Sequence, residues 1–301
     1  MEECMYINHN QMASNVANTL TSHYGNLQTS TKRLSTGLRV NSAADDAAGL
    51  AIRELMRTDI TALQQGVRNA NDAISLIQTA DGALGVIDEK LTRMKELAEQ
   101  AATGTYDSTQ RLMIESEYQA MASEITRIAN STDFNGIHLL NGNLSSSTHS
   151  GSAMTSTGKM KIHFGTANDS AEDYYYIQIG TSTASALGVG NQATASSTTA
   201  DARTVSTQEQ AQKALLGLTN AVVSKDKIRA HLGALQNRLE NTISNLTTQS
   251  ENLQAAESRI SDVDVATEMT SFVRNQILTQ SAVAMLSQAN SMPQMAMQLI
   301  G

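Results

Sequence analysis

Residues 60–77 read ITALQQGVRNANDAISLI. Apolar side chains recur there in alternating steps of three and four, the spacing of a coiled-coil seam along one face of an α-helix. The row begins with Ile60, Leu63, Val67, Ala70, Ile74 and Ile77. It continues, with Asp81 and Asp88 as interruptions, through Leu84, Leu91, Met94, Ala98 and Ala101. The pattern predicts one helix over residues 44–102, roughly 85 Å long at 1.5 Å per residue.

Similar spacing predicts further inner helices. After a turn at residues 104–108, where Asp107 or Ser108 can cap a helix, apolar residues at 114–128 again step by fours and threes. Another long helix is predicted over residues 207–260. The fold class is therefore mainly α, with long antiparallel coiled-coil helices. The chain would leave along one helical rod and return along another.

The two ends of the chain carry heptad rows that are almost free of charge. Between residues 5 and 37 the only charged side chains are Lys32 and Arg33, and none follows Arg274. Low charge promotes association, so we expect these rows to be buried against copies of the same chain. This polymerisation seam consists of Leu20, Leu27, Leu34, Leu278, Met285, Met292 and Leu299.

Residues 141–206 differ in character, because Ser, Thr and Gly dominate. Two segments alternate with a period of two: Met160, Ile162 and Phe164, then Tyr175, Ile177 and Ile179. This alternation, between separators that contain Gly, Asn and Asp, predicts a small β-hairpin or sheet in a surface insert.

Composition and charge exclude several classes of protein. Aromatic residues make up 3% and Trp is absent, which is unusual for a compact core. The net charge is −8 and the basic residues are scattered, so no nucleic-acid partner is expected. No stretch is apolar enough to predict a membrane span. The first residues have no basic and apolar segments of a secretory signal, and composition alone would indicate a cytoplasmic protein.

No catalytic, cofactor or metal site is predicted. The six histidines lack metal-ligand spacing, and the insert holds only His149 and His163. Asp45 and Asp46 are interpreted as charges at a helix N-terminus. The run 174–176, three tyrosines, could form a stacking platform, but packing on the hairpin is the favoured interpretation. The sequence thus indicates a structural protein that is not an enzyme.

Specific strings then indicate a family. Residues 34–50 read LSTGLRVNSAADDAAGL, and residues 132–136 read TDFNG. Residues 256–264 read AESRISDVD, and residues 287–290 read SQAN. With these strings in this order, residues 5–141 and 206–301 resemble bacterial flagellin, the subunit of the flagellar filament. The resemblance leaves only the insert unmatched.

The resemblance implies a domain organisation. Residues 1–44 with 262–301 would form a terminal coiled-coil domain in the filament core. Residues 45–140 with 207–261 would form a helical rod, and residues 141–206 the variable surface insert. The function implied is polymerisation into the filament that serves swimming motility.

The resemblance also implies localisation and partners. The protein would be extracellular, exported by the flagellar type III route without a cleaved signal peptide. Beyond copies of itself, its partners would be an export chaperone at the C-terminal helix and the filament cap and hook-junction proteins. Host Toll-like receptor 5 is a further expected partner, with Arg93, Leu97 and Glu117 as contacts. Arg93 and Leu97 are expected to share an exposed helical face, the alternative being that Arg93 only pairs with Glu89.

Two other functions remain open, and an enzyme with a catalytic insert is disfavoured, because the insert holds only His149 and His163. A hook–filament junction protein is the nearest relative of the favoured interpretation. A secreted coiled-coil adaptor would carry charged positions beside its terminal seams, and an enzyme would need clustered histidines and acids in residues 141–206.

Overall fold

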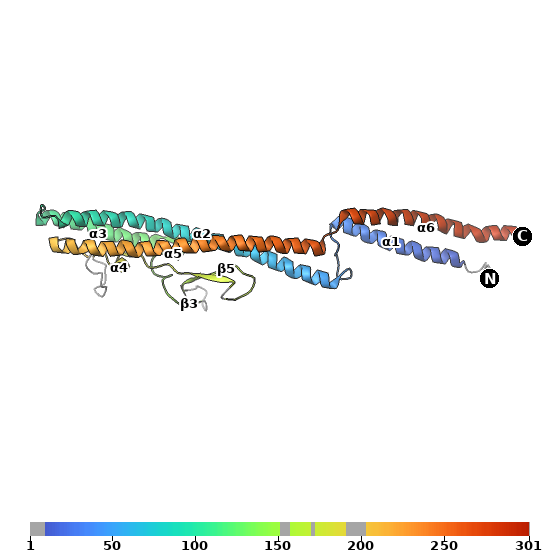
Figure 1. Ribbon diagram of the computed structural model, residues 1–301, viewed down its shortest axis with the longest axis horizontal. Coiled ribbons are helices and arrows are strands. Elements are labelled where there is room, and N and C mark those ends of the chain that lie inside the picture. The colour runs from blue at the N-terminus through green and yellow to red at the C-terminus, as the bar shows by residue number, and fades with distance from the viewer. Residues whose placement is uncertain (1–9, 151–156, 170–171, 191–202, 301) are drawn as a thin grey trace. The chain divides into compact units, whose positions relative to one another are not determined.

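The computed structural model describes residues 10–150, 157–169, 172–190 and 203–300, with the backbone alone for 296–300. Cys4 and the side chain of Leu299 lie outside the described residues. Long helices dominate, so the predicted mainly α fold is confirmed (Figure 1). The helices are α1 (Gln11–Thr36), α2 (Ala47–Ala102), α3 (Ser108–Ser131), α4 (Ala184–Leu187), α5 (Gln208–Ser261) and α6 (Val265–Ile300).

The strands form three short antiparallel pairs. They are β1 (Asp133–Phe134) with β2 (Ile137–His138), β3 (His149–Ser150) with β4 (Thr157–Gly158), and β5 (Met160–His163) with β6 (Tyr174–Ile177). The β5–β6 pair is the hairpin that the alternating segments predict, with Ile162 opposite Tyr175.

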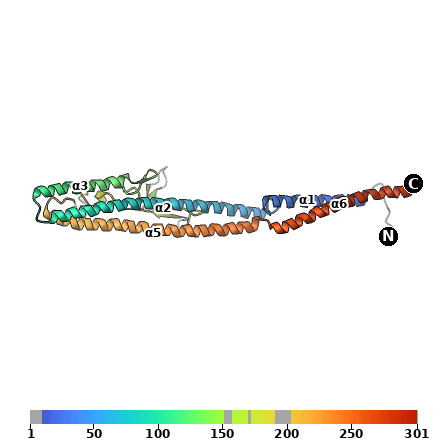
Figure 2. The same ribbon diagram turned by 90° about the horizontal axis from the view of Figure 1, so that it is seen from above.

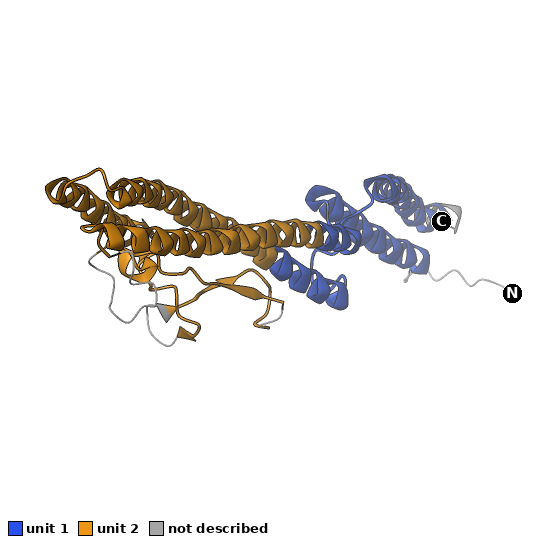
Figure 3. Cartoon of the chain, turned by 60° about the vertical axis from the view of Figure 1, so that its left-hand side comes forward, with its two compact units in different colours: residues 1–60, 251–301 blue, residues 61–250 orange. Residues whose placement is uncertain are grey.

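The chain divides into two compact units, which Figure 3 colours separately. Unit 1 comprises residues 1–60 and 251–301, and unit 2 comprises residues 61–250. The three-part division at residues 44, 140, 206 and 261 stays a prediction.

Unit 2 has a continuous apolar core. In it, α2 packs against both α3 and α5, and Figure 2 shows it between the two. The core takes side chains from all three helices, among them Leu84, Leu91, Met94, Tyr118, Ile125, Leu218, Leu232 and Leu239. Two neighbours cover α2, so its buried face is wider than the single seam predicted, and Ala73, Leu76 and Ile87 are buried as well.

Local hydrogen bonds fix the helix ends. A carboxylate oxygen of Asp46 accepts from the backbone N–H of Gly49 at 2.9 Å, at the start of α2. Asp107 caps α3, and its own N–H donates to the Gln110 side chain at 3.0 Å. The predicted roles of Asp46 and Asp107 at helix starts are thus confirmed, whereas the Asp45 carboxylate accepts from the backbone N–H groups of Asn41 and Ser42 in the turn before α2.

Candidate assembly surface

Helices α1 and α6 lie side by side and antiparallel in unit 1 (Figure 1). Asn10 Nδ2 donates to the carbonyl oxygen of Ala289 at 2.8 Å. At the opposite end of α1, Arg33 Nη1 lies 3.6 Å from a carboxylate oxygen of Glu268. A β-bridge between Leu38 and Asp262 follows directly. These contacts fix the register of the two helices.

The facing sides of α1 and α6 follow the three-and-four spacing. On α1 the buried and half-buried positions include Ala13, Val16, Leu20, His23, Leu27, Ser30 and Leu34. On α6 the buried and half-buried positions include Phe272, Asn275, Thr279, Ala282, Leu286 and Ala289. Among the described side chains of both helices, Ala289 is the only hydrophobic one that is buried. The pair therefore leaves its large apolar side chains partly open to solvent.

A second row on α6 points away from α1. Leu278, Met285 and Met292 have exposed fractions of 39, 60 and 41%; we call them the outer row of α6. Other exposed apolar side chains of the same helix are Val265, Met269, Val273, Ile277, Val283 and Met295.

The structure thus divides the predicted polymerisation seam. Leu20, Leu27 and Leu34 are half-buried on the α1 face that meets α6, whereas the side chains of the outer row of α6 are exposed. The reason is that α1 contacts the companion row of α6, which includes Ala282 and Ala289.

The predicted receptor residues lie in unit 2. Arg93 Nε and Nη2 donate to one carboxylate oxygen of Glu117 on α3, at 3.0 and 2.8 Å. Arg93 Nη1 also donates to Glu96 at 3.0 Å. The bond to Glu117 raises the pKa of Arg93. The structure brings Arg93 and Glu117 together on an exposed surface. The alternative prediction paired Arg93 with Glu89, but its ion-pair partners are Glu117 and Glu96.

The prediction for Leu97 is wrong in one respect. Its side chain is only 2% exposed and belongs to the core, so it does not share an exposed face with Arg93. The physical reason is the wide buried face of α2, which packs against α3 as well as α5.

Two ion pairs between α2 and α5 were not predicted from the sequence. Arg229 donates to both carboxylate oxygens of Asp81, at 2.7 and 3.1 Å. Lys225 Nζ lies 2.5 Å from Asp88 and 2.7 Å from Asp226, with its side chain 2% exposed. The two interruptions of the apolar row are therefore the partners of basic residues on α5. The signal available was that the two acids, seven residues apart, and the two bases, four residues apart, each lie on one face of a helix.

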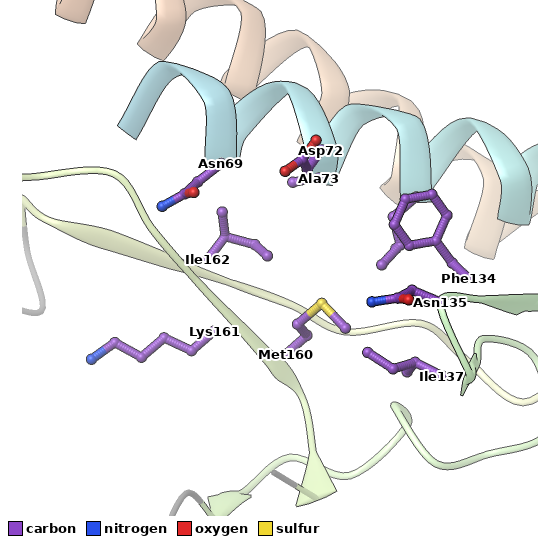
Figure 4. A pocket seen from close by; sticks show the side chains of 10 residues that line it. Asn69, Asp72, Ala73, Phe134, Asn135, Ile137, Met160, Lys161 and Ile162 are labelled. Carbon is purple, nitrogen blue, oxygen red and sulfur yellow. The ribbon is translucent and has the colours of Figure 1, made fainter. Parts of the chain in front are cut away.

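A small pocket of about 240 Å³ lies beside α2 in unit 2 (Figure 4). Its lining combines apolar side chains with Asn69, Asp72, Asn135 and Lys161. Within the described ranges, no cluster of three metal-ligating side chains occurs. No helix among the described residues has the length and hydropathy needed to cross a bilayer.

Long paired helices, a small β-insert and an uncharged apolar terminal surface define a helical structural protein that associates with itself. The family model for the bacterial flagellin N-terminal helical region matches residues 7–145. The model for the bacterial flagellin C-terminal helical region matches residues 215–300. The chain belongs to the bacterial flagellin family, whose members are structural proteins of the extracellular flagellar filament.

Individual relatives agree over the whole length. The "Flagellar filament 33 kDa core protein" of Treponema phagedenis is 41% identical over 296 residues, covering 98% of this chain and 100% of that protein. The flagellin of Bacillus subtilis (strain 168) is 42% identical over 309 residues, with the same coverage. The crystal structure of Bacillus cereus flagellin is 29% identical and covers 63% of this chain and 94% of that one, with a TM-score of 0.45.

Proposed function

We propose that this chain is a non-enzymatic subunit of the flagellar filament that assembles by burying the outer row of α6 against neighbouring copies. The observation that carries the proposal is the exposure of Leu278, Met285 and Met292 on a helix without charge after Arg274. Burial of apolar surface contributes roughly 25 cal/mol per Å². That gain offsets the entropy lost when a free subunit is fixed in the lattice.

The test is a substitution that adds charge to the outer row. Leu278→Lys would place an unpaired ammonium group in a dry interface, which is strongly unfavourable. Because Leu278 is exposed in the single chain, the helical circular dichroism of the monomer should not change. Leu278→Met is the matched control and should sediment as filaments under polymerising conditions. A Leu278→Lys chain that forms as much filament as the parent would refute the proposal.

A filament subunit is favoured over a hook–filament junction protein. Relatives named flagellin or filament core protein match the full chain at about 40% identity. Counting this chain along purified filaments, by gel densitometry and electron microscopy, separates the two. A major subunit should be distributed along the whole filament, whereas a junction protein would be confined to its base.

The remaining proposed partners are an export chaperone, the filament cap and the hook-junction proteins. We propose that an export chaperone covers the outer row of α6 before the subunit leaves the cell by the flagellar export route. The filament cap and the hook-junction proteins would then contact the ends of the assembly. In a binding assay with purified chaperone, Met285→Lys should weaken capture of the chain, and Met285→Leu should not.

We also propose Arg93 and Glu117 as contacts for Toll-like receptor 5. What supports this is their pairing on an exposed surface of α2 and α3. In a receptor reporter assay, monomer carrying Arg93→Ala or Glu117→Ala should signal less than the parent, and Lys213→Ala is the control. Equal signalling by all four proteins would leave the pair as an ordinary surface ion pair.

A further inference from the structure

The β5–β6 hairpin has two chemically different faces. Its inner face is fixed to the helices, because the guanidinium carbon of Arg238 on α5 lies 3.5 Å from the centre of the Tyr175 ring. Asn69 Nδ2 also donates to the carbonyl oxygen of His163 at 2.8 Å. The hairpin is therefore held rigidly, and residues on its other face are presented in a defined arrangement.

The other face gathers two tyrosines, two lysines and two histidines. We call it the tyrosine face; it consists of Tyr174, Tyr176, Lys159, Lys161, His149 and His163. The two tyrosine rings lie 5.4 Å apart in an edge-to-face arrangement. Lys161 Nζ lies 3.6 Å from the centre of the Tyr174 ring, and Lys159 Nζ lies 4.2 Å from that of Tyr176. Each histidine ring borders one tyrosine, His163 at 6.1 Å from Tyr174 and His149 at 5.5 Å from Tyr176.

The charge on this face is positive. Neither lysine forms an ion pair with a carboxylate among the described residues. The nearby carboxylate of Asp173 is occupied by the backbone N–H groups of Ala167 and Asp169. All six side chains of the tyrosine face are partly exposed. A ligand can therefore reach ammonium groups and aromatic rings at the same time.

We propose that the tyrosine face binds an acidic polysaccharide whose sugars carry carboxylates, such as a uronic-acid glycan. Sugar C–H groups pack on aromatic rings, and carboxylates pair with ammonium groups. Two lysines match a sparse charge pattern. Nucleic acid fits less well, because its binding depends on many phosphate contacts and the tyrosine face offers two ammonium groups.

The test is fluorescence anisotropy with a labelled hyaluronate octasaccharide and the full-length chain. The parent should bind the octasaccharide, and the double variant Lys159→Gln/Lys161→Gln should bind about fivefold to tenfold more weakly. The matched control Lys95→Gln/Lys227→Gln removes the same charge from exposed helix positions and should bind within about twofold of the parent. Tyr174→Leu/Tyr176→Leu, with unchanged circular dichroism, should also bind more weakly.

Several results would overturn the proposal. One is that the parent shows no binding of the octasaccharide in the measurement. Another is that the lysine variants of the tyrosine face and of the control helices lose the same affinity. A third is that a neutral dextran oligosaccharide binds as tightly as the hyaluronate octasaccharide. Equally tight binding of a single-stranded oligonucleotide of the same length would show a general anion surface instead. Assembled filaments should bind at least as tightly as monomer because many copies act together. Loss of binding on assembly would show that the face is a contact between subunits.

Discussion

At Gly66 the backbone of α2 meets the backbone of the insert. A Cβ atom on Gly66 would overlap the carbonyl oxygen of Phe164, whereas a Cβ on Gly82 of the same helix would meet nothing. We predict that Gly66→Ala lowers the free energy of unfolding by roughly 1–3 kcal/mol, since overpacking costs that much. Gly82→Ala, the control, should raise it by up to about 1 kcal/mol through helix propensity. Urea unfolding measures both, and a stabilised Gly66→Ala chain would contradict the close approach.

Leu97 and Arg93 are four residues apart, yet we predict that their loss changes stability by very different amounts. Leu97→Ala should lower the free energy of unfolding by about 2–5 kcal/mol, because it leaves a cavity in the unit 2 core. Arg93→Ala should change it by less than about 1 kcal/mol, since its ion pairs are exposed. Denaturant titration of the two variants checks this. Near-equal effects would mean that Leu97 is not a core residue in solution.

At the scale of elements, the Asp81–Arg229 pair predicts a pH dependence. The hydrogen bond from Arg229 lowers the pKa of Asp81. A lowered pKa in the folded state means that the contribution to stability is fully present above the unfolded-state pKa, about 3.9. It is lost as the pH falls through the lower pKa of the folded state. Both side chains are about 40% exposed, so the contribution is below about 1 kcal/mol.

Monomer unfolding at several pH values tests this. Asp81→Asn should be less stable than the parent at pH 7, and the difference should shrink as the pH falls below about 4. Arg229→Gln removes the same pair from the other helix and should show the same convergence. A difference that is constant over the whole range would mean that the pair does not contribute.

The helices were predictable because a row of apolar residues at three-and-four spacing marks one buried face of a helix. The rows that start at Ile60 and Leu278 each gave a helix, but a row does not say which partner covers it. For this reason the sequence could not place Leu97 in the core, nor assign Arg229 to Asp81. Strands of two residues, such as Asp133–Phe134, are too short to show any alternation. The tyrosine run 174–176 was expected to pack as one row, but Tyr175 contacts Phe164 and Arg238, while Tyr174 and Tyr176 lie together on the other face of the hairpin.

At the scale of the whole molecule, burial differs between the two units. Unit 2 has a continuous core, whereas in the described part of α1 and α6 only Ala289 is a buried hydrophobic residue. Helices depend on packing for most of their stability. We therefore predict that trypsin cleaves monomer rapidly near Lys32, Arg33 and Arg274, and leaves a resistant fragment that spans residues 61–250. Mass spectrometry of the early fragments measures this.

Filaments provide the comparison for this experiment. If assembly buries α1 and α6, the same sites should be cut much more slowly in filaments than in monomer. Rates that are equal in the two states would contradict the assembly surface proposed above.

The side-chain chemistry of the outer row of α6 bears on the mechanics of a filament. Met285 and Met292 are joined on the same helix by Met269 and Met295, all exposed in the single chain. Methionine is unbranched and polarizable, so it fills gaps of different shapes at little cost. Branched side chains, in contrast, favour one interlocking arrangement. A methionine-rich contact can slide by a fraction of a helical turn and repack, which would let a polymer bend and supercoil under torque while its subunits stay bound.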